Sequence, residues 1–263
     1  MGNIIKTSPH KQINFLKKEI AKVSYSSQEG HVPSAYSIMD LLWVLFKESI
    51  NVYPRNQKIS DKFILSKGHG SLALYAMLLE NKKITLKEFS SFSKYHSKLG
   101  GHPDSNKLPN VLASTGSLGH GLAISVGMAM SSKILNIDNK IYCLIGDGEC
   151  NEGSIWESVL LAAEHKLDNL CCILDMNHSG DRAIKLSNLK EKFLSFGWAV
   201  KTIDGHNHKE IKSSYKSYKK NRPFIIIAET IKGRGVKMME NSHAWHRRSP
   251  NKDELDLILE ELN

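Results

Sequence analysis

Short apolar segments alternate with segments of helical pattern from residue 141 onward, and this alternation constrains the fold more than any other feature. The expected strands cover residues 141–145, 170–174, 198–203 and 224–228, and the expected helices cover residues 156–165, 189–196 and 209–218. Apolar strands that alternate with helices of this length are typical of a parallel sheet with helices on both faces. We therefore expect an α/β fold built on such a sheet.

The residues before this alternation have a mainly helical pattern. The expected helices there cover residues 13–24, 36–46, 71–79 and 86–92, followed by a helix rich in small residues at 118–135. No internal repeat, low-complexity tract or Pro/Gly-rich linker marks a domain boundary. We expect one domain over residues 1–263, with residues 1–110 mostly helical and residues 232–263 forming a tail.

Composition limits the classes of protein to which the chain can belong. Its 263 residues are 41% hydrophobic and 24% charged, as in ordinary globular proteins. There is no apolar run of the roughly 18 residues that a membrane span needs, and no signal-peptide pattern. The cysteines lack zinc-ligand spacing with histidines and are expected to be reduced thiols; they are Cys143, Cys150, Cys171 and Cys172. We expect a cytoplasmic protein that binds no membrane.

The chain carries a net charge of +9, from 36 basic and 27 acidic residues. The lysines are scattered, and only residues 209–220 form a basic amphipathic stretch, which we interpret as a solvated helix face. Neither a zinc finger nor the aromatic-basic pattern of an RNA-binding sheet is present. We expect no nucleic-acid partner, and the positive charge suits phosphorylated small molecules.

The most unusual residues follow two of the expected strands. Gly146-Asp147-Gly148 comes directly after the strand at 141–145, and Asn177 follows the next strand. In parallel sheets ligands bind at the carboxyl ends of strands, where free N–H groups attract anions. Asp147 and Asn177 offer hard oxygen ligands for Mg²⁺ or Ca²⁺, and the glycines allow a phosphate to approach the backbone. The sequence therefore predicts a site for a metal and a diphosphate.

A lone Gly-Asp-Gly is usually just a turn, but the interval that follows it is informative. Residues 149–176, which are 28 positions, separate Gly148 from Asn177 in the order motif, helix, strand, Asn. This arrangement resembles the thiamine-diphosphate motif, and residues 146–157 resemble its transketolase form. The resemblance implies that Asp147, the Asn177 side chain and the Ser179 carbonyl hold the metal.

The same resemblance assigns cofactor-binding residues around the metal. Gly148 and Glu149 would lie at the diphosphate, and the backbone of Gly116 and Leu118 would hold the aminopyrimidine ring. The loop after Asn177 departs from the family pattern, because the second asparagine is replaced by His178 and residues 179–182 also differ.

Histidines in family-like contexts, each beside Gly or Pro or near the chain end, extend the resemblance over residues 10–250. His31 lies where transketolases carry an N-terminal active-site histidine, His69 matches the histidine that contacts the diphosphate, and His102 matches a substrate-binding histidine. His246 or its rival His243 matches the last family histidine, with a cofactor contact implied for His246. Imidazoles suit hydrogen bonding to sugar hydroxyls and proton transfer near neutral pH.

Glu152 and Glu157 admit two interpretations. Both would lie near the start of the helix that follows the motif, where the helix dipole favours carboxylates. In transketolase-like proteins the matching carboxylates instead face the partner subunit and link the active sites.

The family's pyrimidine-binding domain, with its glutamate, has no counterpart before the chain ends at Asn263. The resemblance therefore implies the N-terminal subunit of a split transketolase, active only with a C-terminal, pyrimidine-binding subunit, in an α2β2 assembly. The implied reaction transfers a two-carbon ketol unit from a ketose, usually phosphorylated, to an aldose, with thiamine diphosphate and Mg²⁺ or Ca²⁺ as cofactors.

Other functions remain as alternatives. The α subunit of a 2-oxo-acid dehydrogenase shares the motif, but its phosphorylation-loop pattern is not seen. A transketolase-like enzyme of specialised carbohydrate biosynthesis fits the atypical loop at 178–182. A nicotinamide enzyme would need a third glycine in the motif, which is absent. A non-catalytic regulatory or nucleic-acid-binding module is the alternative of a different class.

Overall fold

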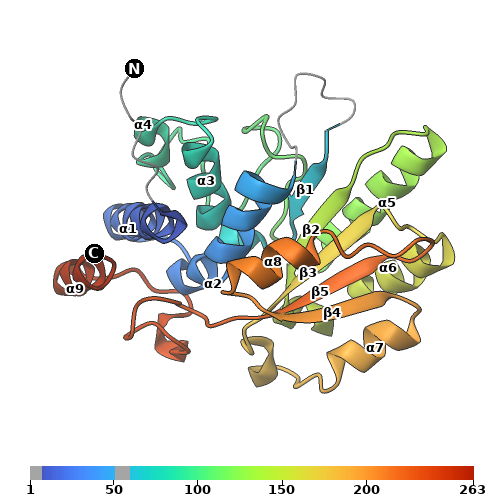
Figure 1. Ribbon diagram of the computed structural model, residues 1–263. Coiled ribbons are helices and arrows are strands. Elements are labelled where there is room, and N and C mark those ends of the chain that lie inside the picture. Colours follow the sequence, from blue (N-terminus) through green and yellow to red (C-terminus); the bar gives the residue numbers. More distant parts are fainter. Residues whose placement is uncertain (1–7, 51–59) are drawn as a thin grey trace.

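The computed structural model describes residues 8–50 and 60–263, which form a parallel sheet of five strands (Figure 1). All neighbouring strands are parallel, and their order across the sheet is β1-β2-β3-β5-β4. The strands are β1 (Lys62–Leu65), β2 (Ile141–Gly146), β3 (Leu170–Met176), β4 (Ala199–Asp204) and β5 (Phe224–Glu229). The predicted α/β fold with a parallel sheet is confirmed.

The strands β2, β3 and β5 are apolar at nearly every position because both of their faces are buried. In β2, Cys143 and Ile145 belong to a core that also holds residues of α5, α6 and α7. Tyr142 and Leu144 point the other way, into a larger core shared with α1, α2, α3 and α8. Alternate side chains of a strand leave opposite faces, so two buried faces require a nearly continuous apolar run.

The helices stand on both sides of this sheet and at its ends. Those before the sheet's main strands are α1 (Pro9–Ser27), α2 (Val32–Val44), α3 (Ser71–Glu80) and α4 (Leu86–Phe89). The later ones are α5 (His120–Ile134), α6 (Gly153–Glu164), α7 (Leu189–Ser195), α8 (His208–Ser214) and α9 (Lys252–Glu261). In Figure 1, α5, α6 and α7 lie on one side of the sheet, and α9 lies beside α1, against which it packs.

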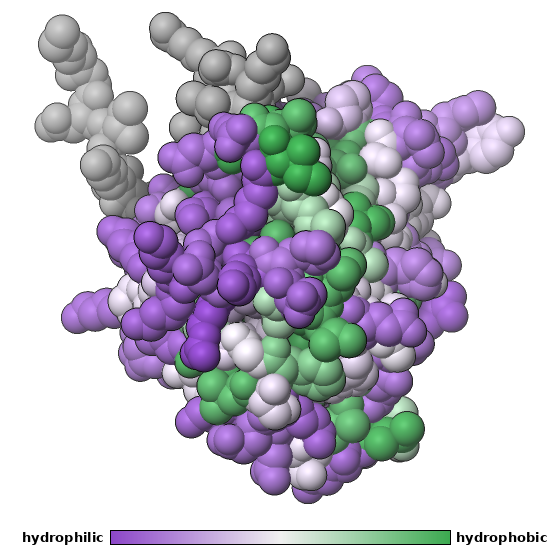
Figure 2. Space-filling model, turned by 90° about the vertical axis from the view of Figure 1, so that its right-hand side faces the viewer, coloured by the Kyte–Doolittle hydropathy of each residue, from purple (hydrophilic) through white to green (hydrophobic). Residues whose placement is uncertain are grey.

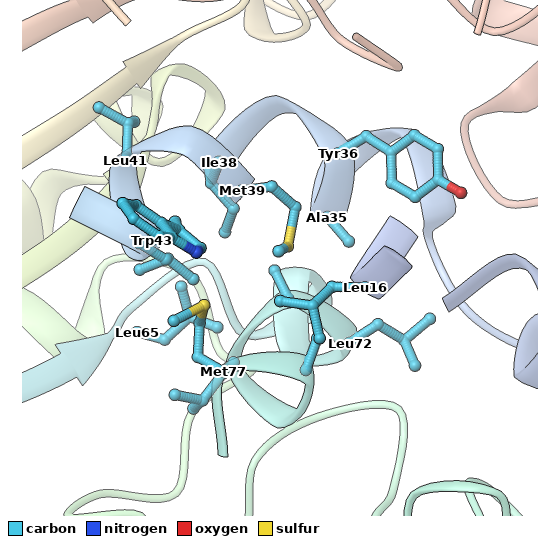
Figure 3. Packing of buried hydrophobic residues seen from close by; sticks show 14 of the residues in the cluster. Leu16, Ala35, Tyr36, Ile38, Met39, Leu41, Trp43, Leu65, Leu72 and Met77 are labelled. Atoms are coloured by element: carbon cyan, nitrogen blue, oxygen red, sulfur yellow. The ribbon is translucent and has the colours of Figure 1, made fainter. Parts of the chain in front are cut away.

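Helix α2 lies deepest in the larger core. Every residue of it except Asp40 is buried, which is the pattern of a helix surrounded by other elements. Figure 3 shows Ile38, Met39 and Trp43 facing Met77 of α3. The N-terminal end of α2 is thereby held rigidly, and this is the end at which His31 stands.

The strand β1 lies within residues 1–110, which the sequence predicts to be mostly helical, and was itself not predicted. Its apolar run, Phe63–Leu65, is too short to stand out from the sequence, and it pairs with β2 rather than with a strand close in sequence. Residues 51–59, which precede it, lie outside the described residues.

The outer surface of α5 and α6 keeps apolar side chains that no part of the described chain covers. Ile134 is 75% exposed and Leu160 is 60% exposed, and others are Ile124, Leu135 and Leu161. Figure 2 looks onto this side and shows a band of hydrophobic surface between hydrophilic margins. Among the helices of residues 8–50 and 60–263, none has the length and apolar character needed to cross a bilayer.

Candidate functional site

Asp147 lies at the carboxyl end of β2, where the chain turns into the short helix Asp147–Asn151. Its two carboxylate oxygens accept hydrogen bonds from the backbone N–H groups of Gly148, at 2.8 Å, and Gly180, at 3.2 Å. The side chain is buried, and burial raises the pKa of Asp147. A cation beside this carboxylate would offset the unfavourable burial of its charge.

Asn177 stands one residue beyond the end of β3, the strand next to β2. Its side-chain N–H group donates to Asp175 Oδ2 at 2.7 Å, and its oxygen accepts from the Ser179 N–H at 3.0 Å. The Ser179 hydroxyl is buried and has no hydrogen-bond partner among the described residues. The structure thus gathers Asp147, Asn177 and Ser179 around one end of a cavity.

This set contains only one carboxylate. Within the described part of the chain, no three His, Cys, Asp or Glu side chains form a group suited to a metal. A magnesium ion usually takes few protein carboxylates and completes its shell with waters and substrate phosphates. The site therefore suits a metal that arrives together with a phosphorylated ligand.

Two glycine pairs bring backbones into direct contact beside this end. A Cβ atom on Gly180 would stand 2.7 Å from the Gly148 Cα atom, and one on Gly68 would stand 2.8 Å from the Gly116 nitrogen. Such distances exclude any side chain. The glycines thus close the loops after β1, β2 and β3 around a common space.

Glu149 acts as a positioning residue in this arrangement. Its Oε1 atom accepts hydrogen bonds from Ser66 Oγ at 2.6 Å and from the Gly119 N–H at 2.9 Å, and its Oε2 atom accepts from the Gly146 N–H at 2.9 Å. Since both oxygens already have donors from the protein, the side chain ties the ends of β1 and β2 to the start of α5. The sequence predicts Glu149 at the cofactor, and this residue does line the cavity.

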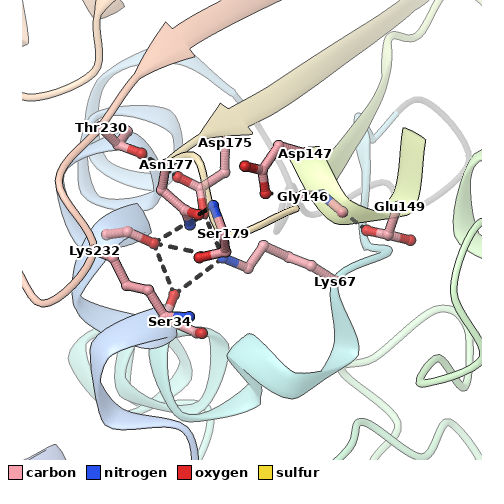
Figure 4. Close-up of polar contacts among 12 residues, drawn as sticks. Ser34, Lys67, Gly146, Asp147, Glu149, Asp175, Asn177, Ser179, Thr230 and Lys232 are labelled. Atoms are coloured by element: carbon pink, nitrogen blue, oxygen red, sulfur yellow. Dashed lines mark hydrogen bonds and ion pairs between the residues drawn. The ribbon is translucent and has the colours of Figure 1, made fainter. Parts of the chain in front are cut away.

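A buried ion pair forms the floor of the site and was not predicted. Lys67 Nζ lies 2.5 Å from Asp175 Oδ2, and their side chains are 1% and 0% exposed. Asp175 also accepts hydrogen bonds from the hydroxyls of Ser37 and Thr230. Figure 4 shows Lys67, Asp175 and Thr230 in this cluster. The only sequence signal was a lysine beside the Gly-His pair in residues 61–70, since Asp175 lies within an apolar strand.

Four of the predicted histidines line the same cavity, whose volume is about 700 Å³; they are His31, His69, His102 and His246. The ring centroids of His31 and His69 are 5.4 Å apart, and those of His31 and His246 are 5.7 Å apart. Burial, followed by neighbouring positive charges, lowers the pKa of His31 to about 4. The same causes lower the pKa of His69 well below its ordinary value. Both rings are therefore neutral at pH 7.

The structure brings His246 to the cavity and leaves its rival outside. His243 is exposed, in the turn His243–Trp245, and is not part of the cavity wall. His246 Nδ1 lies 2.7 Å from Lys232 Nζ, and because an ammonium group can only donate, Nδ1 is the acceptor. Lys232 was not predicted either; burial, then the charge of Lys67, lowers its pKa to about 8.

The segment that carries Lys232 is anchored from two sides. His206 Nε2 accepts a hydrogen bond from the Ile231 N–H at 2.9 Å, so its Nδ1 atom donates to Asp40 at 2.9 Å. The Gly233 N–H donates to the Pro33 carbonyl, two residues beyond His31, at 3.0 Å. The two sides of the cavity are thereby joined through α2.

The remaining predicted residues divide between the cavity and the outer surface. Gly116 and Leu118 line the cavity from the loop that precedes α5. Glu152 is exposed and lies at the cavity's edge, whereas Glu157 is exposed on α6 and lies outside the cavity.

Comparison with known proteins gives one consistent family match. Residues 10–262 match the family model described as transketolase, thiamine diphosphate binding domain. Two similar relatives are each named as one subunit of an apulose-4-phosphate transketolase. The one from Phocaeicola vulgatus is 33% identical over 94% of this chain and 91% of its own length. The one from Actinobacillus succinogenes is 35% identical over 96% and 95%.

A solved structure shares the fold described above. The transketolase of Campylobacter jejuni superposes with a TM-score of 0.90 at 32% identity, and the match covers 97% of this chain but 42% of that one. The chain thus spans nearly all of the two apulose-4-phosphate transketolase relatives and less than half of the solved transketolase.

Proposed function

The chain belongs to the family of transketolase thiamine-diphosphate-binding domains, and from this we propose that it holds the diphosphate and metal of thiamine diphosphate in a two-subunit transketolase. With a pyrimidine-binding partner, the assembly transfers a two-carbon ketol unit from a ketose phosphate to an aldose phosphate. The observation that carries this proposal is the cavity that Asp147 and Asn177 share with the four histidines.

The residues at the strand ends fit the cofactor in three ways. Asp147, the Asn177 side-chain oxygen and the Ser179 carbonyl would supply oxygen ligands for a divalent ion, for which Mg²⁺ is our choice. The Gly148 and Gly180 backbones leave no side chain between the loops and a diphosphate. The buried oxygens of Ser179 and Asn151, without partners among the described residues, mark polar positions that a ligand would satisfy.

Bound thiamine diphosphate supplies the electron sink that allows a carbon–carbon bond beside a carbonyl to be broken and re-formed. The chain's own residues orient the reactants. Neutral rings of His31 and His69 can each donate one hydrogen bond and accept another, which suits the hydroxyl groups of a sugar. The Lys232 contact leaves the His246 proton on Nε2, so this ring is a hydrogen-bond donor at that atom.

The partner is proposed from the relatives and from the surface. The two relatives named as transketolase subunits are matched over nearly their whole length, which supports a separate second chain. Glu152 and Glu157 are exposed beside the apolar band of α5 and α6, and we assign that side to the partner in an α2β2 assembly. The names of the relatives also favour a phosphorylated ketose as substrate.

Calorimetric titration with thiamine diphosphate, with and without Mg²⁺, tests the cofactor site on this chain. We expect metal-dependent binding that Asp147→Asn weakens strongly, because the amide loses the charge that attracts the cation. Asp138→Asn, which changes an exposed carboxylate away from the cavity, is the matched control. Binding that needs no metal, or that Asp147→Asn leaves intact, contradicts the proposed site.

Assays of ketol transfer with and without the pyrimidine-binding partner test whether activity requires both subunits. The chain alone should be inactive, and activity should appear when the two subunits are mixed. Ketol transfer by this chain alone would refute the split site.

A further inference from the structure

Arg247 follows His246 and lines the cavity at its mouth, where its side chain is exposed. The family resemblance assigns this residue no role. Its position next to His246 places it on the histidine side of the cavity. The positive charge of Arg247 also contributes to the lowered pKa of His31, so the guanidinium lies within electrostatic reach of that ring.

The backbone around Arg247 is fixed by its neighbours. Trp245 is buried, and the Arg248 guanidinium lies 4.0 Å from the centre of its ring and forms an ion pair with Glu254. Ser249 Oγ accepts a hydrogen bond from Ser24 Oγ at 3.1 Å. Arg247 is therefore a side chain presented to the cavity from an anchored turn, which lowers the entropy lost when it binds a ligand.

In the described part of the chain, the charge of Arg247 is not compensated by an acidic partner. Among the described residues, no carboxylate lies within ion-pair distance of its guanidinium, whereas Arg248 has Glu254 and Lys67 has Asp175. A guanidinium that faces a cavity without an acidic partner is suited to bind an anion. Its planar fork fits a phosphate with two parallel hydrogen bonds.

We propose that Arg247 is a specificity-determining residue that binds the phosphate group of the sugar phosphate substrate. This inference rests on the proposed function and deepens it, because it names the side chain of this subunit that distinguishes phosphorylated from unphosphorylated sugars. The other phosphate group that Arg247 could bind is the diphosphate of the cofactor. We assign that diphosphate to the Asp147 and Gly148 end of the cavity, where the metal ligands lie.

Three variants test the assignment in the complex with the pyrimidine-binding partner: Arg247→Gln, Arg247→Lys and, as the matched control, Arg248→Gln. Acceptors are compared in pairs, D-ribose 5-phosphate with D-ribose and D-glyceraldehyde 3-phosphate with D-glyceraldehyde, using an unphosphorylated donor. Arg247→Gln should lower kcat/KM for the phosphorylated acceptors about 10- to 100-fold and leave the unphosphorylated ones unchanged, the range expected for losing a hydrogen bond to a charged group. Arg247→Lys should retain part of the preference.

The control separates recognition from structure. Arg248→Gln removes the ion pair with Glu254 and should lower the melting temperature without changing the ratio between the two acceptors of a pair. Each ratio compares kcat/KM for two acceptors measured on one protein preparation. Partial unfolding lowers both values equally, so it does not change the ratio. An unchanged ratio in Arg247→Gln would overturn the inference. So would a rise in the dissociation constant of thiamine diphosphate without a change in the ratio, which would assign Arg247 to the cofactor.

A binding measurement keeps this test independent of catalysis. The chain loaded with thiamine diphosphate and Mg²⁺ is titrated with D-ribose 5-phosphate and with D-ribose, and Arg247→Gln should weaken only the former. Phosphate-dependent binding without ketol transfer by the complex would count against the proposed function alone. Ketol transfer whose phosphate preference does not depend on Arg247 would count against this inference alone.

Discussion

The pair of Lys67 and Asp175 shows how much one buried ion pair beneath the site contributes to the stability of the fold. Their side chains are almost fully buried, so removing the lysine would leave a carboxylate without its cation in the interior. We expect Lys67→Met to lower the free energy of unfolding by about 3–5 kcal/mol, the range for breaking a buried ion pair. Chemical denaturation of the chain without cofactor measures this.

Lys47→Met is the matched control, because the Lys47–Glu80 pair is partly exposed, at 29% and 23% of the side-chain surface. An exposed pair contributes about 0–1 kcal/mol. Equal losses in both variants would contradict the assignment of Lys67 as a structural residue.

His31 should make the free energy of unfolding depend on pH. Its lowered pKa gives the direction of this dependence. Above about pH 6.5 the ring is neutral in both the native and the unfolded chain. Between about pH 6.5 and 4 the unfolded chain binds a proton that the native ring does not, so the free energy of unfolding falls with falling pH. Below about pH 4 the native ring is also protonated, and the loss levels off.

His31→Gln should therefore reduce the loss of stability between about pH 7 and about pH 4.5, the window set by the lowered pKa. The measurement is the difference in the free energy of unfolding between the two pH values, for the wild type and the variant. His243→Gln, which replaces the exposed histidine outside the cavity, is the control. A drop in His31→Gln as large as in the wild type would show that the His31 ring is not held neutral.

At the scale of elements, the site depends on how closely the loops after β2 and β3 meet. A Cβ atom on Gly180 would meet the Gly148 backbone at 2.7 Å, so Gly180→Ala should push the two loops apart. Forcing an extra methyl group into a packed contact costs about 1–3 kcal/mol. We expect metal-dependent binding of thiamine diphosphate to weaken about tenfold or more, as measured by calorimetry.

Gly127→Ala provides the comparison, because a Cβ atom there meets nothing within 4 Å and alanine favours the helix. This variant should bind the cofactor as the wild type does. If Gly180→Ala also bound the cofactor normally, the two loops would not need their close contact.

The elements also show what a sequence can and cannot reveal. The strands β2, β3 and β5 were predicted because burial on both faces makes them apolar at nearly every position. The strand β1 was missed, since only Phe63–Leu65 is apolar and its pairing partner lies far along the chain. Asp147 and Asn177 follow the carboxyl ends of two of these strands. Their closeness could therefore be predicted once the strands were assigned.

The floor and mouth of the site could not be predicted in this way. The pairing of Lys67 with Asp175 joins residues 108 positions apart, and neither residue has a local pattern that names its partner. The choice between His243 and His246 depends on the turn His243–Trp245, in which His243 is exposed and Trp245 is buried. Both features are tertiary, so the sequence alone does not reveal them.

At the scale of the whole molecule, the two sides of the sheet differ in what covers their helices. The core with α1, α2, α3 and α8 is closed further by α9, which packs on α1. On the other side, the outer surface of α5 and α6 keeps the apolar band of Figure 2. An exposed apolar surface with polar margins is typical of an interaction site. Part of this surface lies on α6, the helix that starts after Glu152.

Leu160→Glu should therefore prevent the proposed α2β2 assembly while leaving the isolated chain folded. Leu160 is 60% exposed, so a carboxylate there is solvated in the free chain but would be buried without a partner at the interface. Loss of the leucine's own burial is worth about 1.5–3 kcal/mol, which is about 10- to 100-fold in affinity before the charge is counted. Light scattering after size-exclusion chromatography of the mixed subunits measures the assembly, and circular dichroism checks the fold.

Leu257→Glu is the control, since Leu257 is 49% exposed on α9, on the side of α1. If Leu160→Glu assembled like the wild type, or if both variants failed alike, the band on α5 and α6 would not be the partner surface.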